Sequence, residues 1–277
     1  MSRPFDVCWE RITRARTHRN AIANAWNSFI EEHPYDVRSY VNDDGTGGIL
    51  IEQVRPIPLL IAVEIGEFLY QLRAALDACI YETACLNTGR RPPPDENKLE
   101  FPVCVSLDVF KKASRKIVPL TRQQRDIVEA VQSYNAPSLT ADELPYNFNR
   151  CLGILNDWAR KDRHRGLHVI ASWASDIKPL IIIPSSAKLV EFRVVRDAFV
   201  LKDESEVATF RIDGWQRGMS VKTNPNLYLD IAVDETPQPC HSVDSLGQRF
   251  LCMELAVRTI VDGMSKMVSA VSPPHGP

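Results

Sequence analysis

The sequence lacks a strong charge of either sign. Its 277 residues include 33 Lys and Arg and 35 Asp and Glu, which gives a formal net charge of −2 at pH 7. A nearly neutral protein has no overall field that draws it to nucleic acid or to an anionic membrane surface. Such binding would have to come from a local patch of charge.

Paired cysteines are also missing. The seven cysteines are scattered along the chain, and no Cys-x-x-Cys pair occurs among them. This spacing argues against a cysteine-bound metal and against the disulfide framework of a small secreted domain. We therefore expect no metal and no cofactor.

Long apolar runs are absent as well. No uninterrupted apolar stretch approaches the roughly 18 residues that cross a bilayer. The N-terminal segment MSRPFDVCWERITR has no apolar core of the kind that marks a secretory signal. We expect a cytoplasmic protein without a membrane partner.

The apolar residues that are present follow the helical period over much of the chain. They predict long helices near residues 5–30, 58–87, 141–161 and 243–269. Two shorter helices are expected near 107–116 and 122–134. The second of these is preceded by Thr121-x-x-Gln124, the spelling of a capping box that provides partners for the first backbone amides of a helix.

Strand signals occupy two other parts of the chain. A hairpin is predicted near residues 37–54, where two strand-like runs flank the turn sequence DDGTGG. After His168 the period changes, and the pattern predicts a mainly antiparallel sheet near 169–233. Together these elements predict an α+β fold.

We expect this fold to be a single domain over residues 1–277. In this interpretation, residues 1–168 and 240–270 form a helical body and residues 169–235 form a β-rich section. Residues 271–277 are expected to be a disordered tail.

Charged residues occupy inward positions on two of the predicted helices. At 100° per residue, Arg73 and Asp77 fall within an apolar arc, four residues apart. Asp162 continues the apolar stripe of a later helix. Because inward charges are normally paired, we expect Asp162 to meet Arg73. Asp77 is then left to hold Arg163, Arg165 or a histidine.

The most concentrated polar stretch is RKDRHRGLH, residues 160–168. Its excess of positive charge suits phosphate oxygens, which makes RNA a candidate partner. The alternative is a solvated helix end, where the helix dipole stabilises cations. Arg73, Asp77, Asp162 and Arg165 are candidates for phosphate binding or, alternatively, for a structural clasp.

Two histidines of this stretch have the spacing of a metal-binding helix. His164 and His168 are four residues apart, but Arg165 stands where the zinc signature HExxH has its glutamate. The mismatch argues against a metal.

The same stretch contains the spacing Arg-x4-His, from Arg163 to His168. This pattern resembles the ribonuclease motif of HEPN domains, helical modules common in bacterial toxins and antiphage systems. The resemblance implies that His168 is a general acid and base, that Arg163 stabilises phosphate charge, and that a homodimer forms. Histidine titrates near neutrality and a cation offsets charge at phosphate, so the chemistry is metal-independent.

A broader set of motifs resembles an uncharacterised family of bacterial proteins. The motifs are GEFLYQLRAALD at residues 66–77, Phe101-Pro102, Gln132-x-Tyr134 and DRHR at residues 162–165. The resemblance covers residues 9–168 and implies no activity. It implies that the following residues occur together: Arg73, Asp77, Asp162, His164 and Arg165.

Two hypotheses follow for the function. The first is a HEPN-like bacterial RNA-processing or antiphage-defence protein, a metal-independent ribonuclease with Arg163, His168 and His164 as catalytic residues. The second is a non-enzymatic structural or interaction module in which the Arg/Asp/His cluster is a buried ionic clasp.

Overall fold

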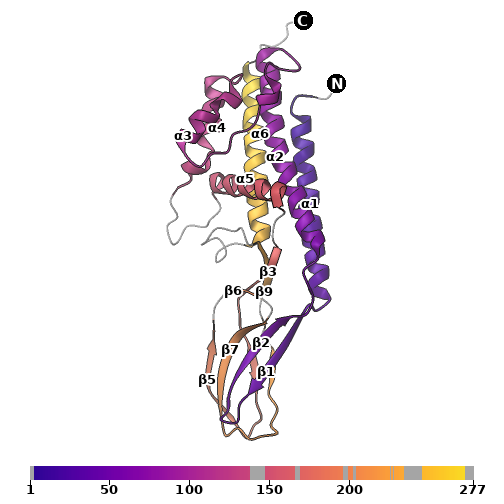
Figure 1. Ribbon diagram of the computed structural model, residues 1–277, viewed down its shortest axis with the longest axis vertical. Helices are drawn as coiled ribbons and strands as arrows, with labels where there is room; N and C mark the ends of the chain where they lie inside the picture. Colours follow the sequence, from indigo (N-terminus) through magenta and orange to yellow (C-terminus); the bar gives the residue numbers. More distant parts are fainter. Residues whose placement is uncertain are drawn as a thin grey trace. The chain divides into compact units, whose positions relative to one another are not determined.

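A computed structural model gives the fold of the protein (Figure 1). It describes residues 3–137, 147–165, 169–195, 199–201, 204–224, 226, 228–233 and 245–271. Within these ranges the chain forms helices and antiparallel strands, which confirms the α+β fold. No helix of the described residues is both long and apolar enough to cross a membrane.

Contacts between residues divide the chain into two compact units. Unit 1 combines Met1–Ala23, Ala62–Leu167 and Gly247–Pro277, and unit 2 combines Asn24–Ile61 with His168–Leu246. The hairpin that the sequence pattern assigns to the helical body therefore belongs to unit 2. The assignment of both units to a single domain stays a prediction.

The long helices have nearly the predicted bounds. They are α1 (Asp6–Glu31), α2 (Leu59–Thr88), α5 (Phe148–Arg165) and α6 (Leu246–Val271). Helix α5 continues beyond the predicted end at residue 161, while its predicted start near residue 141 lies outside the described residues. Val271 still belongs to α6, and the rest of the predicted tail also lies outside the description.

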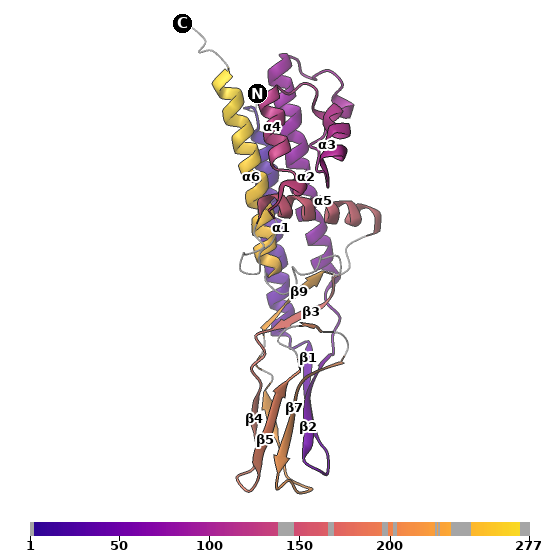
Figure 2. The ribbon, with the colours of Figure 1, turned by 90° about the vertical axis from the view of Figure 1, so that its left-hand side faces the viewer.

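The parts of α1, α2 and α6 that belong to unit 1 lie side by side, and α5 crosses them (Figures 1 and 2). One apolar face of α2 is fully buried, because residues such as Ile65 and Leu72 recur at helical spacing. Phe68 of α2 packs against Phe250 of α6 with ring centroids 4.6 Å apart. These contacts form the core of unit 1.

A buried carboxylate joins α1 to α6. The Glu254 side chain is only 3% exposed, and its Oε1 accepts hydrogen bonds from Nε and Nη2 of Arg16 at 2.9 and 2.7 Å. Arg19 Nη1 lies 2.8 Å from Oε2 of the same carboxylate. Two cations thus offset the cost of burying Glu254.

Shorter helices pack beside α2 in unit 1. They are η1 (Glu96–Lys98), α3 (Leu107–Ala113), η2 (Ser114–Ile117), α4 (Arg122–Ala130) and η3 (Ser133–Asn135). The predicted capping box of α4 is confirmed. Gln124 N–H donates to Thr121 Oγ1 at 3.3 Å, and Thr121 N–H donates to Gln124 Oε1 at 2.8 Å.

Unit 2 contains the sheets. The largest has the antiparallel strand order β1-β2-β7-β5. Its strands are β1 (Tyr35–Val41), β2 (Thr46–Gln53), β7 (Glu204–Asp213) and β5 (Lys188–Val194). The hairpin predicted near residues 37–54 is therefore confirmed as β1 and β2. Its turn contains Gly45 at φ +81°, where a Cβ would lie 2.2 Å from the Ile212 carbonyl oxygen.

Two smaller antiparallel sheets complete unit 2. One has the order β6-β3-β9, and the other pairs β4 with β8. Their strands are β3 (Val169–Ser175), β6 (Phe199–Val200), β9 (Tyr228–Val233), β4 (Leu180–Ile182) and β8 (Lys222–Asn224). The pair of β4 and β8 is antiparallel, with Ile181 opposite Thr223.

Replacing Thr121 by alanine should destabilise unit 1 by about 1 kcal/mol, because the helix loses a side-chain acceptor at its N-cap. Urea denaturation followed by circular dichroism measures the change. Thr13→Ala is the control, since Thr13 is an exposed threonine inside α1 and caps no helix. Equal stabilities of the two variants would contradict the capping role.

Candidate functional site

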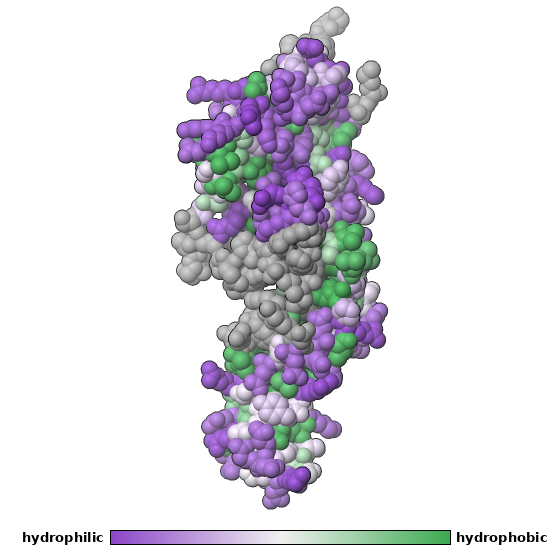
Figure 3. Space-filling view, viewed as in Figure 1, coloured by the Kyte–Doolittle hydropathy of each residue, from purple (hydrophilic) through white to green (hydrophobic). Residues whose placement is uncertain are grey.

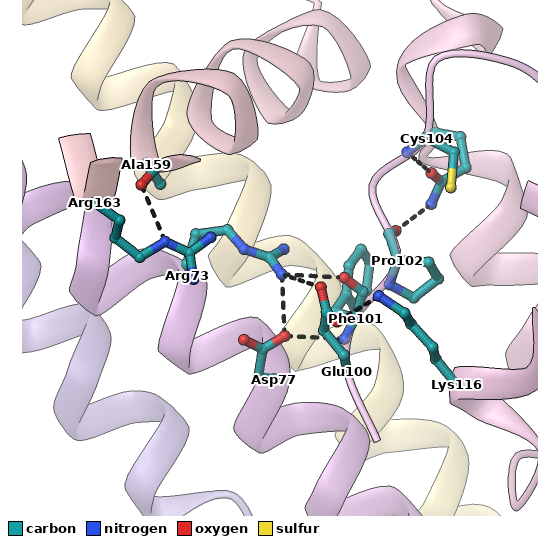
Figure 4. Close-up of polar contacts among 10 residues, drawn as sticks. Arg73, Asp77, Glu100, Phe101, Pro102, Cys104, Lys116, Ala159 and Arg163 are labelled. Atoms are coloured by element: carbon teal, nitrogen blue, oxygen red, sulfur yellow. Dashed lines mark hydrogen bonds and ion pairs between the residues drawn. The ribbon is translucent and has the colours of Figure 1, made fainter. Parts of the chain in front are cut away.

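Arg73 projects from α2 toward the backbone of a neighbouring extended segment (Figure 4). Its side chain is only 9% exposed. Nη2 donates to Asp77 Oδ1 at 3.1 Å and to the Phe101 carbonyl oxygen at 3.2 Å. Glu100 Oε1 lies 3.6 Å from the same nitrogen. The buried guanidinium therefore has both a backbone acceptor and nearby negative charge.

Asp77 binds the backbone N–H of Phe101, the residue whose carbonyl oxygen accepts from Arg73. The Phe101 N–H donates to Asp77 Oδ1 at 2.9 Å. Both the N–H and the C=O of Phe101 are thus bound by side chains of α2, one turn apart. These bonds replace the ladder that an extended segment would otherwise need in a sheet.

Gln132 binds the continuation of this segment. Its side chain is fully buried, and Nε2 donates to the Pro102 carbonyl oxygen at 2.9 Å. The Cys104 N–H donates to Gln132 Oε1 at 2.7 Å. Ser133 Oγ donates to the Cys104 carbonyl oxygen at 2.7 Å. We call residues 101–104 the clasped segment, because polar side chains bind its backbone from two directions.

Arg73 and Asp77 also line a small cavity of about 70 Å³. Its lining residues are Gly66, Tyr70, Arg73, Ala74, Asp77, Ala159, Asp162 and Arg163. Arg73 Nη1 is buried and has no hydrogen-bond partner among the described residues. α2 and α5 approach closely here, since a Cβ on Gly66 would lie 2.6 Å from Asp162 Oδ2. A glycine at position 66 therefore leaves room for the Asp162 carboxylate.

The predicted ion pair between Arg73 and Asp162 is wrong. The prediction that Asp77 holds Arg163, Arg165 or a histidine stays a prediction, because the side chain of Arg165 and all of His168 lie outside the described residues. The sequence also predicts that Arg73 pairs with Asp162. Instead, Arg73 makes its hydrogen bonds to Asp77 and Phe101, while Asp162 lines the same cavity. The reason is that Phe101 offers a backbone acceptor and a backbone donor next to α2, which a pattern of side chains does not reveal.

The two described residues of the ribonuclease-like motif lie at the surface. Arg163 and His164 are exposed near the end of α5. Arg163 Nε donates to the Ala159 carbonyl oxygen at 3.2 Å. His168 lies outside the described residues, and the side chain of Arg165 does so too. The structure thus separates a buried part of the predicted cluster from an exposed part.

The two basic residues that open the stretch have a counter-charge. Arg160 Nη2 lies 3.2 Å from Asp157 Oδ1, and Lys161 Nζ lies 2.8 Å from Asp157 Oδ2. Asp157 thereby reduces the net positive charge that the sequence pattern suggests for this end of α5. Among the described residues, no group of three or more His, Cys, Asp or Glu side chains could hold a metal ion. The absence of a cofactor stays a prediction.

Partial burial changes the acidity of Asp77. Desolvation raises the pKa of its carboxyl above the usual range, and the positive charge of Arg73 and the Phe101 N–H offset only part of this effect. Asp157 behaves in the opposite way. Burial raises the pKa of its carboxyl, but the hydrogen bonds from Lys161 and Arg160 lower that pKa by more, so the net shift is downward.

Periodicity identifies neither the clasped segment nor the role of Gln132. An extended segment outside a sheet has no hydrophobic period that would mark it in the sequence. Only the family resemblance points to the motifs Phe101-Pro102 and Gln132-x-Tyr134. Gln132 lies 30 residues from Pro102 in the sequence. Their proximity depends on the path of the chain.

Comparison with known proteins finds no matching family model, no matching curated protein and no matching solved structure. Both resemblances of the sequence therefore stay predictions.

The raised pKa of Asp77 has a measurable consequence for stability. A carboxyl with a raised pKa in the folded state contributes stability that is fully present below the unfolded pKa of about 3.9 and is lost as the pH rises through the folded pKa. The unfolding free energy of the parent, minus that of Asp77→Asn, should therefore fall as the pH rises from about 3 to 7. Asparagine keeps an oxygen that can accept from Arg73 and Phe101.

Asp157→Asn is the matched control for this experiment. The pKa of Asp157 is lowered, so its contribution is present above the unfolded pKa and is lost as the pH falls through the folded pKa. The corresponding free-energy difference should rise over the same pH range. Urea unfolding at several pH values measures both. Slopes of the same sign would contradict the two environments described here.

Proposed function

We propose that the chain is a non-enzymatic binding module in which the Arg73–Asp77 pair is a structural clasp. The observation that carries this proposal is that Arg73 donates a hydrogen bond to the Phe101 carbonyl oxygen while Asp77 accepts one from the Phe101 N–H. A group whose hydrogen bonds already hold the protein's own backbone is poorly placed to bind a substrate with the same atoms. The clasp instead positions the chain that follows.

The segment after the clasp has the character of a binding surface. Several of its large apolar side chains are exposed: Val105 (81%), Leu107 (41%), Val109 (45%) and Val118 (59%). Figure 3 shows hydrophobic side chains among hydrophilic ones over the part of unit 1 that Figure 1 labels α3. Apolar groups within a polar rim are typical of interaction sites. The clasp anchors the start of this surface.

Arg73→Ala should destabilise the protein by about 2 kcal/mol, because hydrogen bonds from a charged donor are lost in a buried place. It should also speed amide hydrogen exchange at Phe101 and Cys104, as the clasped segment opens. Arg163→Ala is the control, since Arg163 is exposed, and should change the unfolding free energy by less than about 0.5 kcal/mol. Unchanged exchange at both amides in Arg73→Ala would refute the clasp.

A second candidate is a HEPN-like, metal-independent ribonuclease of the RNA-processing or defence type. Its support is the exposure of Arg163 and His164 at the end of α5, where both side chains are open to an RNA phosphate. In this proposal Arg163 stabilises charge on the phosphate, and His168 transfers the proton, with His164 as the other histidine available. The motif implies that two copies of the chain combine.

The ribonuclease proposal is tested with single-stranded RNA in the presence of a metal chelator. His168→Ala and Arg163→Ala should each abolish cleavage while circular dichroism remains that of the parent. Arg160→Ala is the charge control on the same helix, because Arg160 is paired with Asp157, and it should still cleave. If the parent does not cleave RNA, or if His168→Ala still does, the binding module is the remaining function.

A further inference from the structure

A groove with a volume of about 860 Å³ lies in unit 1, next to the clasped segment. Its walls include Lys98, Leu99, Arg115, Lys116, Val118 and Pro119. The volume falls within the range typical of sites for small organic ligands. Neither functional hypothesis from the sequence uses any of these residues.

Positive charge dominates one part of the groove. Lys98 is paired with Asp95 at 2.9 Å, and Lys116 is paired with Glu100. Arg115 is exposed, and its side chain has no hydrogen bond or ion pair to any residue that the structure describes. An arginine presents a planar array of donors that matches phosphate oxygens. Arg115 is therefore the group most available to an anion.

The sequence around Arg115 adds to this charge. Residues 111–116 read KKASRK, with four cations in six positions. Three cations and two carboxylates line the groove itself, namely Lys98, Arg115, Lys116, Asp95 and Glu100. The lining thus keeps a net positive charge even with both carboxylates ionised.

Apolar groups form most of the remaining lining, together with Thr88 and Asn97. Leu99, Val118 and two prolines, Pro94 and Pro119, contribute carbon surface, and Val118 is 59% exposed. An inorganic anion would leave this surface in water. A ligand with a ring attached to its phosphate would cover it, which is favourable by about 25 cal/mol per Å² of apolar surface removed from water.

Hydrogen bonds hold the wall that carries Val118 and Pro119. Asn87 Nδ2 donates to the Pro119 carbonyl oxygen at 3.0 Å. Arg125 donates to the carbonyl oxygens of Val118 and Leu120. Because these bonds do not require a ligand, the wall is formed in advance and binding has little ordering to offset.

Glu100 connects the groove to the clasp. Its Oε2 pairs with Lys116 in the groove, and its Oε1 lies 3.6 Å from Arg73 Nη2. The next residue, Phe101, is the one whose backbone Arg73 and Asp77 bind. The clasp therefore fixes the groove wall that contains Glu100.

We propose that this groove binds an organic phosphate that carries an apolar ring and has, as a whole, about the size of a mononucleotide. The phosphate contacts Arg115, and the ring lies on Leu99, Val118 and Pro119. The proposal rests on the proposed binding module, since it names the ligand class of that module.

Isothermal titration calorimetry of the full chain at about 0.15 M salt tests the proposal, with ADP, adenosine and inorganic pyrophosphate as probes. ADP should bind one to one, and at least about tenfold more tightly than either of the other probes, because only ADP has both the anionic and the apolar part. Arg115→Ala should weaken ADP binding roughly tenfold to a hundredfold. Lys98→Ala is a second variant and should weaken it less, since Lys98 is already paired.

Arg258→Ala is the matched control, because Arg258 is an exposed arginine on α6 that does not line the groove, and its affinity for ADP should equal that of the parent. Absence of ADP binding, or equal binding by Arg115→Ala, overturns the proposal. Pyrophosphate binding as tight as that of ADP reduces the groove to a site for inorganic anions and overturns it as well. Faster exchange at Phe101 in Arg73→Ala reports on the clasp separately, so failure of the groove and failure of the clasp are distinguishable.

Discussion

The burial of one guanidinium determines how the middle of unit 1 is organised. Arg73 is almost inaccessible to solvent, and a buried cation is stable only when its donors find partners. It finds them in Asp77, one turn further along α2, and in the carbonyl oxygen of Phe101. Asp77 in turn accepts the N–H of Phe101. An extended segment without a sheet thus acquires the hydrogen bonds that a neighbouring strand would normally supply.

Several other features depend on this attachment. Gln132 binds Pro102 and Cys104, which continue the segment that Arg73 and Asp77 hold at Phe101. Glu100 is placed between Arg73 and Lys116, and so belongs both to the clasp and to the groove. The exposed apolar residues from Val105 onward begin directly after the last clasped residue. In the proposed module, the Arg73–Asp77 pair therefore contributes to function indirectly, by holding the start of the exposed apolar surface.

Local patterns predicted much of the fold. The spacing of apolar residues predicted helices α1, α2 and α6. The capping box at Thr121 follows from a threonine and a glutamine three positions apart. The hairpin of β1 and β2 follows from its glycine-rich turn. In each case the residues that interact are close in sequence. Strand β8 has only three residues, too few to establish a period, so its bounds depend on its pairing with β4.

The sequence by itself determined that Arg73 faces inward and that Asp77, whose side chain is 40% exposed, lies one turn from it, because the position of a side chain on a helix depends only on its spacing from neighbouring residues. Only the tertiary structure decided which groups they meet. Phe101 brings a backbone N–H and a backbone C=O to them, and such groups are the same at every residue apart from proline. Whether such backbone groups lie within reach of Arg73 and Asp77 depends on the path of the chain in the folded protein. A pattern of side chains therefore predicted an ionic pair between α2 and α5, whereas the fold placed a backbone segment against Arg73 and left Asp162 to line the adjoining cavity.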